Sequence, residues 1–255
     1  MIVIVNHLPM NDIPTDNFTF ILQHREKNGN YSIVGLAENA ISIDTAQSIF
    51  SHLGSLTFQG GVTSFGEIPR EQLWINSCGE DFGVRAGWKD VDNPRWKAHP
   101  FDDYLRGVCA LVQVKFASYR LHMIDGVCDA RYDSLLGNKY RGLGDSIKPH
   151  RDSEEVFGNN PSVMIVSVGY PREMIFRRII YNKEKLKSIK IDKTFDGVQE
   201  FSVTLPSGSI LFMGGEVQKY YSHEIRKVRT ESDRVDSSPD VNLVRYSLTF
   251  RQYSR

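Results

Sequence analysis

The residues with the clearest chemical potential are His150 and Asp152, which are separated by a single residue. In a strand, residues i and i+2 point to the same face, so this imidazole and this carboxylate project into one space. A metal site needs a third ligand, and His223 is the candidate. Two histidines and one carboxylate that leave other positions open are typical of non-haem iron sites. A His-x-Asp pair also occurs by chance, and a lone histidine is more often a hydrogen-bonded structural residue.

The segment from Arg245 to Arg251 has a second pattern that suits ligand binding. Polar residues, with an arginine at each end and two hydroxyl side chains between them, alternate with apolar ones. Period two therefore predicts a strand with one polar and one apolar face. Guanidinium groups bind carboxylates through paired hydrogen bonds, so this face suits a dicarboxylate. A solvent-exposed face of an antiparallel strand would give the same alternation. Asn138 and Tyr140 also share one face.

Residues 59–98 show no clean periodicity, yet they contain all three tryptophans, Trp74, Trp88 and Trp96. A loop rich in large aromatic residues either wraps the edge of a core or presents stacking surfaces to a ligand. The sequence leaves both interpretations open. The glycines at 60, 61 and 79 would permit the movement that a lid requires.

These residues must be positioned by a sheet supported by helices. Apolar spacing predicts one helix that begins at Asp44, with Asp44 as its cap, and ends at Gly54, and a second over 101–116. At least seven short strands follow, which favours an α+β fold whose sheets form a sandwich or jelly roll. Asn28-Gly29 predicts a hairpin near the N-terminus. The expected strands are 18–22, 31–36, 132–140, 147–152, 162–169, 173–181, 201–205, 209–213, a segment around His223, and 243–252.

The composition excludes several classes of protein. Lysine plus arginine equals aspartate plus glutamate, 31 of each, so any binding of nucleic acid must use a local basic patch. Three widely spaced cysteines do not fit a disulfide framework or a cysteine zinc site and favour a reducing compartment. No apolar run is long enough to span a bilayer. We expect a monomeric cytoplasmic or nuclear protein without membrane contact.

Several short motifs occur in a fixed order along the chain. Together they resemble the AlkB family of Fe(II)- and 2-oxoglutarate-dependent dioxygenases, over roughly residues 55–253. Each motif is short, and the ordered set carries the resemblance. The motifs are Asn138-x-Tyr140, His150-x-Asp152-x-Glu154, Ser167-Val168-Gly169, Phe176-Arg177, Leu205-x-x-Gly208-x-x-Leu211-x-Met213-Gly214-Gly215, Tyr221-x-His223 and Arg245-x-x-Leu248-Thr249-Phe250-Arg251.

The resemblance implies a double-stranded β-helix core, the jelly roll, with supporting N-terminal helices and a nucleotide-recognition lid at about 59–98. It divides the chain into an N-terminal strand extension, 1–36, and a dioxygenase domain, 37–255. The implied Fe(II) ligands are His150, Asp152 and His223. The residues implied to hold 2-oxoglutarate are Arg245 and Arg251, which would bind its two carboxylates, with Asn138, Tyr140 and Ser247 beside them. Ser247 stands where the family commonly has an asparagine, which weakens the contact expected there.

The resemblance also implies a substrate side. Glu154 stands where the family has an acidic residue that helps to read the base, and Pro69-Arg70 resembles a lid motif of some members. The residues expected to contact the base are Glu154, Arg70, Trp74, Phe82 and Trp88, with Phe82 and Trp88 as the stacking candidates.

The implied activity is oxidative demethylation of bases such as 1-methyladenine and 3-methylcytosine in methylated DNA or RNA. It consumes O2 and 2-oxoglutarate and yields succinate, CO2 and formaldehyde. A methylated base in a duplex must first be flipped out of the stack, and an aromatic lid suits that state. Two alternatives stay open: a hydroxylase with the same cofactors that acts on a protein or small molecule, and a non-catalytic nucleic-acid-binding relative.

Overall fold

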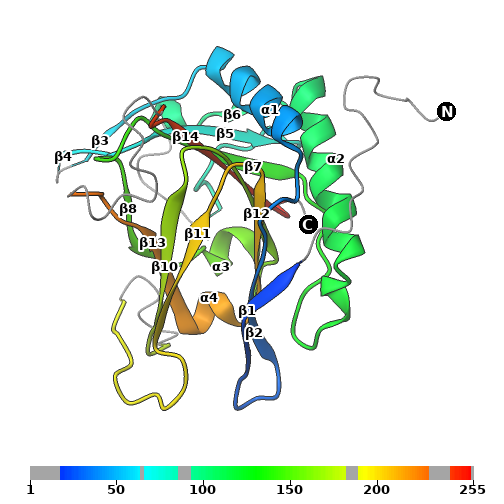
Figure 1. Ribbon diagram of the computed structural model, residues 1–255, viewed down its shortest axis with the longest axis vertical. Coiled ribbons are helices and arrows are strands. Elements are labelled where there is room, and N and C mark those ends of the chain that lie inside the picture. The colour runs from blue at the N-terminus through cyan, green and yellow to red at the C-terminus, as the bar shows by residue number, and fades with distance from the viewer. Residues whose placement is uncertain (1–17, 64–65, 86–92, 182–188, 230–241, 254–255) are drawn as a thin grey trace.

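The computed structural model describes residues 18–63, 66–85, 93–181, 189–229 and 242–253. Its largest element is an eight-stranded sheet with the strand order β1-β2-β12-β9-β14-β7-β5-β6 (Figure 1). All neighbouring pairs are antiparallel except β5 and β6. The strands are β1 (Thr19–Arg25), β2 (Tyr31–Ala37), β12 (Ser209–Gly215), β9 (Val163–Gly169), β14 (Arg245–Arg251), β7 (Ser134–Tyr140), β5 (Glu71–Asn76) and β6 (Ala98–His99).

A second, four-stranded sheet has the order β11-β10-β13-β8. Its strands are β11 (Glu200–Leu205), β10 (Arg172–Arg178), β13 (Tyr221–Ile225) and β8 (Ile147–His150). From β7 to β10 each successive strand changes sheet, and the chain changes sheet again at β12, β13 and β14. This alternation builds two facing antiparallel sheets, and the expected double-stranded β-helix is confirmed.

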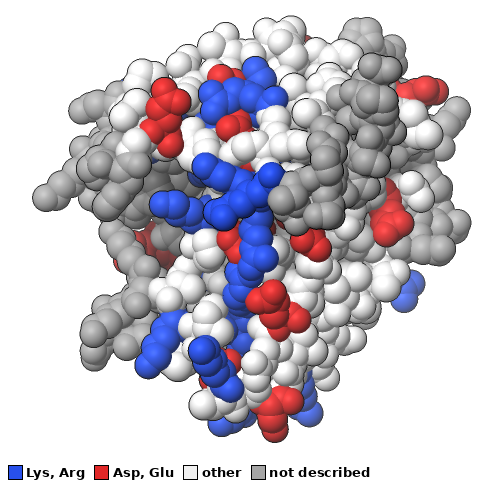
Figure 2. All heavy atoms as spheres, turned by 60° about the vertical axis from the view of Figure 1, so that its left-hand side comes forward, with Lys and Arg blue, Asp and Glu red and all other residues white. Residues whose placement is uncertain are grey.

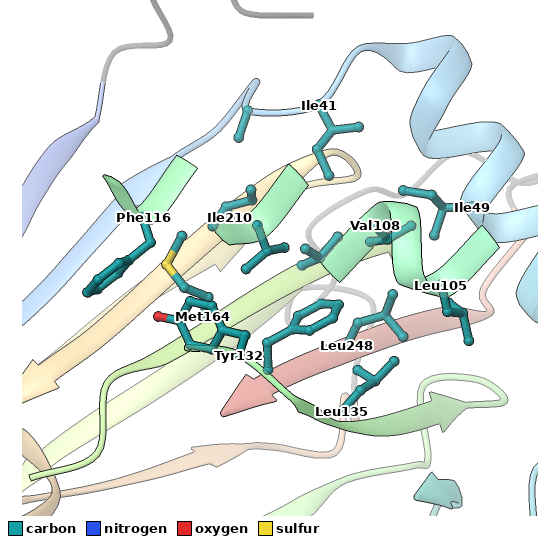
Figure 3. Packing of buried hydrophobic residues seen from close by; sticks show 14 of the residues in the cluster. Ile41, Ile49, Leu105, Val108, Phe116, Tyr132, Leu135, Met164, Ile210 and Leu248 are labelled. Atoms are coloured by element: carbon teal, nitrogen blue, oxygen red, sulfur yellow. The ribbon is translucent and has the colours of Figure 1, made fainter. Parts of the chain in front are cut away.

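Two helices cover the outer face of the large sheet, α1 (Ile43–Ser55) and α2 (Asp103–Ser118) (Figure 1). Figure 3 shows their apolar side chains, including Ile49, Leu105 and Val108, packed over the strand residues Met164 and Leu248. The smaller elements are β3 (Val62–Thr63), β4 (Gly66–Glu67), η1 (Pro94–Trp96), η2 (Leu121–Met123), α3 (Glu154–Phe157) and α4 (Val217–Tyr220). No helix within the described ranges combines the length and hydrophobicity that crossing a bilayer takes.

The faces of the central strands explain why the site lies between the sheets. In β14, Tyr246, Leu248 and Phe250 belong to the core under the helices. The alternating polar residues therefore point to the other face, toward the smaller sheet. All seven residues of β14 are buried, so its polar face is not solvent-exposed. The alternation indicates a buried polar lining.

Three details of the predicted elements were wrong. β8 ends at His150, two residues earlier than predicted. Ser42, not Asp44, caps α1: its side chain accepts from the backbone N–H of Thr45, and Asp44 lies in the first turn. Residues 71–76 form β5, a strand of the large sheet, where we expected only loop. Five of its six residues are buried, and a strand buried on both faces shows no alternation that could announce it.

The N-terminal hairpin joins the large sheet directly. β2 pairs with β12 over six residues. The buried carboxylate of Glu26 accepts hydrogen bonds from both terminal nitrogens of Arg178 on β10, at 2.7 and 2.8 Å. At the hairpin tip, Asn28 and Asn30 donate to Glu216, the residue before α4. The hairpin therefore contacts β10 and the residue before α4 through these hydrogen bonds. The domain boundary expected after residue 36 stays a prediction.

Candidate metal centre

Pairing of β8 with β13 brings the two histidines together. His150 and His223 lie opposite each other in the strand register, and their ring centroids are 4.3 Å apart. Asp152 follows the end of β8, which is shorter than the predicted strand. The possible ligand atoms of these three residues all lie within 4.8 Å of one another. Residues far apart in the sequence thus form one cluster of metal-binding groups, as the sequence analysis anticipated.

Both imidazoles are held in the form that binds metal ions. Burial lowers the pKa of His150, and burial together with the neighbouring His150 lowers the pKa of His223 to about 3. Neutral imidazole is the ligand form, so neither ring must lose a proton near neutral pH. Nδ1 of His150 lies 3.0 Å from the carbonyl oxygen of Lys148. Since a carbonyl only accepts, Nδ1 carries the hydrogen and the Nε2 lone pair is available.

Asp152 is buried, yet it is held as a carboxylate. Burial alone would raise its pKa, but the neighbouring Arg251 guanidinium outweighs that effect and the net pKa is lowered. Nη2 of Arg251 donates to Oδ1 at 2.6 Å. Gln218 on α4 holds the residue from the other side: its Oε1 accepts from the Asp152 backbone N–H at 2.9 Å and its Nε2 donates to Oδ2 at 3.3 Å. The sequence analysis missed Gln218, because only the folded chain brings it to Asp152.

Two buried arginines stand on β14: Arg251 lines the cavity itself, whereas Arg245, at the other end of the strand, lies against the cavity-lining Tyr140, with its guanidinium carbon 5.1 Å from that ring's centroid. Arg245 lies opposite Tyr140 in the register, and Ser247 lies opposite Asn138. Nε of Arg245 donates to Ser167 Oγ at 3.0 Å, but its two terminal nitrogens have no hydrogen-bond partner among the described residues. Nε and Nη1 of Arg251 are in the same situation. Burial lowers the pKa of Arg245 to about 10, which still leaves it charged at neutral pH.

These groups fit a divalent metal ion and a dianion side by side. Buried donors are rarely left unpaired, because an unsatisfied polar group costs roughly 1–3 kcal/mol and a charged one more. Four unpaired guanidinium nitrogens therefore call for acceptors from a ligand. A carboxylate and two neutral imidazoles supply the oxygen and nitrogen donors that Fe(II) takes. The residues thus fit Fe(II) and 2-oxoglutarate.

The cavity that holds the cluster also has an aromatic side. Phe82 and Trp96 line it and stack on each other, with centroids 4.8 Å apart and planes at 22°. Arg70 lines it too, and donates to Asn138 Oδ1 at 2.9 Å and to the Ser146 carbonyl at 3.3 Å. Trp96 was not selected from the sequence, because nothing there separates it from the other tryptophans.

Two residues expected to touch the base lie elsewhere. Trp74 on β5 is fully buried behind Phe82, and its indole N–H donates to the Glu80 carbonyl, so no surface is left for a substrate. Glu154 begins α3 and is not among the cavity-lining residues. Its carboxylate accepts from Tyr181 Oη at 3.5 Å and from the Asn160 backbone N–H at 3.4 Å. Trp88 lies outside the described residues.

Comparisons with known proteins agree with this geometry. A sequence profile of the 2OG-Fe(II) oxygenase superfamily matches residues 36–251. The chain is 25% identical over 181 residues to a protein of Arabidopsis thaliana named DNA oxidative demethylase ALKBH2. This match takes in 66% of this chain and 51% of that protein, so the chain spans about half the length of this relative.

Solved structures share the fold at low sequence identity. The structure of OsALKBH1 superposes with a TM-score of 0.57 at 14% identity, covering 86% of this chain and 96% of that one. An oxidoreductase of the 2OG-Fe(II) oxygenase family from Burkholderia pseudomallei superposes with a TM-score of 0.51 at 11% identity, covering 86% and 84%.

Proposed function

This chain belongs to the 2OG-Fe(II) oxygenase superfamily, and from that premise we propose that it oxidatively demethylates N-alkylated nucleobases in DNA or RNA. The substrates are of the 1-methyladenine and 3-methylcytosine type, and succinate, CO2 and formaldehyde are released. The observation that carries the proposal is the cluster of His150, Asp152 and His223 together with two buried arginines of β14 that have unpaired donors, of which Arg251 contacts Asp152 directly. The relative named as a DNA oxidative demethylase supports the choice of nucleic acid.

Separate residues of the site bind the metal ion and the co-substrate. His150, Asp152 and His223 hold the iron, and Arg245 and Arg251 bind the carboxylates of 2-oxoglutarate, with the side chains opposite them on β7 as neighbours. Bound Fe(II) would supply the redox chemistry that couples O2 and 2-oxoglutarate to oxidation of an N-methyl C–H bond. Arg251 keeps Asp152 ionised, so the site needs no proton to leave when metal enters.

The other lining residues shape what can enter. Leu136, Phe157 and Ile165 make much of the lining apolar, which limits water around the reacting methyl group. The stacked rings of Phe82 and Trp96 offer an aromatic surface to a base that has left its stack. Hydroxylation converts the N-methyl group to N-hydroxymethyl, which loses formaldehyde and returns the N–H.

A basic surface supports nucleic acid as the partner. Figure 2 shows lysine and arginine side chains gathered in a band on the side of the molecule that carries β8 and β13, with acidic side chains along it. Lys148 on β8 and Arg226 and Lys227, directly after β13, are exposed. With a net charge of zero, attraction to phosphates depends on such a local patch.

The proposal is tested by formaldehyde release from methylated DNA and RNA oligonucleotides, single- and double-stranded, with and without added Fe(II). We expect iron- and 2-oxoglutarate-dependent release from at least one oligonucleotide carrying 1-methyladenine or 3-methylcytosine. Turnover of 2-oxoglutarate to succinate without formaldehyde from any oligonucleotide would contradict the choice of substrate. It would favour a hydroxylase that acts on a protein or small molecule.

A further inference from the structure

Gln72 is a polar residue of the cavity with no role in the chemistry described so far. It lies on β5, opposite Asn138 of β7 in the strand register. Its side chain lines the same cavity as the metal cluster, and the residue is 1% exposed. A buried polar side chain in such a place needs hydrogen-bond partners. Among the described residues, only one of its two amide atoms has such a partner.

Neighbouring residues fix the orientation of this amide. Nε of Arg70 donates to one amide atom of Asn138 at 2.9 Å, and since arginine only donates, that atom is the oxygen, Oδ1. The Gln72 amide atom 3.1 Å from the same Oδ1 must in turn be the nitrogen, Nε2. Oε1 of Gln72 is therefore the atom left over. It is buried and accepts no hydrogen bond from any described residue.

An unpaired hydrogen-bond acceptor suits only one of the two ligands that the cavity would hold, 2-oxoglutarate and the substrate. 2-Oxoglutarate is a dianion and needs donors, so a carbonyl oxygen aimed at it would repel it. A ligand that brings an N–H group satisfies the oxygen instead. Such a partner matters, because a buried acceptor without one costs as much as a lost hydrogen bond.

Phe82 and Trp96 offer a surface for a base on the segment that neighbours β5. β5, which carries Gln72, pairs with β6. β6 begins at Ala98, two residues after Trp96 at the end of η1. The stacked pair lines the same cavity as Gln72. An aromatic surface and a hydrogen-bond acceptor thus lie on neighbouring segments. This combination matches a planar base with an amino group at its edge.

We propose that Oε1 of Gln72 accepts a hydrogen bond from the exocyclic amino group of the methylated base. Gln72 then favours adenine- and cytosine-derived bases, which carry that amino group, over guanine- and thymine-derived ones, which carry a carbonyl oxygen in its place. This inference rests on the proposed function. It gives the role expected from the sequence for Glu154 to a residue that faces the cavity.

The test compares the wild-type protein with Gln72→Leu and Glu154→Gln on two classes of oligonucleotide. One class carries 1-methyladenine or 3-methylcytosine, and the other carries 1-methylguanine or 3-methylthymine. For Gln72→Leu we expect kcat/KM on the amino class to fall about ten-fold relative to the carbonyl class, the size of one hydrogen bond to a buried partner. The KM for 2-oxoglutarate is measured beside it, since a merely structural effect through Asn138 would raise that value for both classes alike.

Binding without turnover separates this inference from the proposed function. With Fe(II) and 2-oxoglutarate present and O2 excluded, fluorescence anisotropy gives Kd for each oligonucleotide. We expect the wild-type preference for the amino class to shrink about ten-fold in Gln72→Leu. Equal losses on both classes, no change, or a change in Glu154→Gln alone would each overturn the assignment. Failure of the wild-type protein to release formaldehyde contradicts the demethylase proposal, while the Kd ratios still decide the role of Gln72.

Discussion

The two sides of the cavity differ in how the chain holds them. The cofactor wall consists of the lining residues His150, Asp152, His223 and Arg251, with Arg245 behind Tyr140, and each of these groups is fixed by strand pairing or by a hydrogen bond. On the substrate wall, made by Gln72, Phe82 and Trp96, one strand and a connecting segment supply the side chains. Side chains on paired strands are held in precise positions, which suits catalysis. Connecting segments vary more in sequence and conformation, which suits them to determine substrate specificity.

The largest effect on 2-oxoglutarate binding is expected for Arg245→Leu on the cofactor wall. It removes a buried cation whose two terminal nitrogens await an acceptor. Truncating one partner of a buried charged pair costs several kcal/mol, so we expect the KM for 2-oxoglutarate to rise on the order of 100-fold. Steady-state kinetics with varied 2-oxoglutarate measures this.

Arg178→Leu is the matched control, because Arg178 is also buried but pairs with Glu26 of the N-terminal hairpin. It should lower the thermal midpoint while the KM for 2-oxoglutarate of the folded protein stays close to wild type. If both variants raised this KM equally, Arg245 would have no specific part in binding the co-substrate.

A smaller effect, on Fe(II) binding, is expected for Gln218→Leu, because Gln218 contacts the metal ligand Asp152 and not the metal site itself. This change removes both hydrogen bonds that orient Asp152. Losing the partner that orients a metal ligand typically weakens metal binding by about 10-fold or somewhat more, so we expect a shift of that size in the Kd for Fe(II), measured by anaerobic titration.

Gln113 offers a matched glutamine on the opposite side of the large sheet. It accepts from the Tyr132 backbone N–H and donates to the Ala130 carbonyl. Gln113→Leu should affect stability without changing the Kd for Fe(II). An unchanged Kd in Gln218→Leu would mean that Asp152 keeps its position without help from α4.

Much of the cofactor wall could be predicted from the sequence. His150 and the alternating residues of 245–251 lie on strands and follow period-two rules, so their shared faces could be inferred. Asp152 lies two residues past the end of β8, where period two no longer applies, yet its spacing from His150 still pointed to the right cluster. The helices were predicted from their apolar stripes, although the cap of α1 was misplaced. β5 was missed because both its faces are buried, which removes the alternation.

The substrate wall depended on contacts that no local pattern encodes. Trp74 and Trp96 look alike in the sequence, yet one is buried behind Phe82 and the other lines the cavity. Glu154 follows the metal motif at the right spacing, but α3 begins there and turns its carboxylate toward Tyr181. Gln72 could be recognised only through its hydrogen bonds with Asn138 and the orientation that Arg70 imposes.

The most direct test of the metal centre is anaerobic titration of Fe(II) into wild-type protein, His150→Ala and His122→Ala. His122 is an exposed histidine outside the cavity and serves as the control. We predict one iron per chain in the wild type and in His122→Ala, and no stoichiometric binding in His150→Ala. Stoichiometric Fe(II) binding that survives in His150→Ala would contradict the assignment of the metal centre.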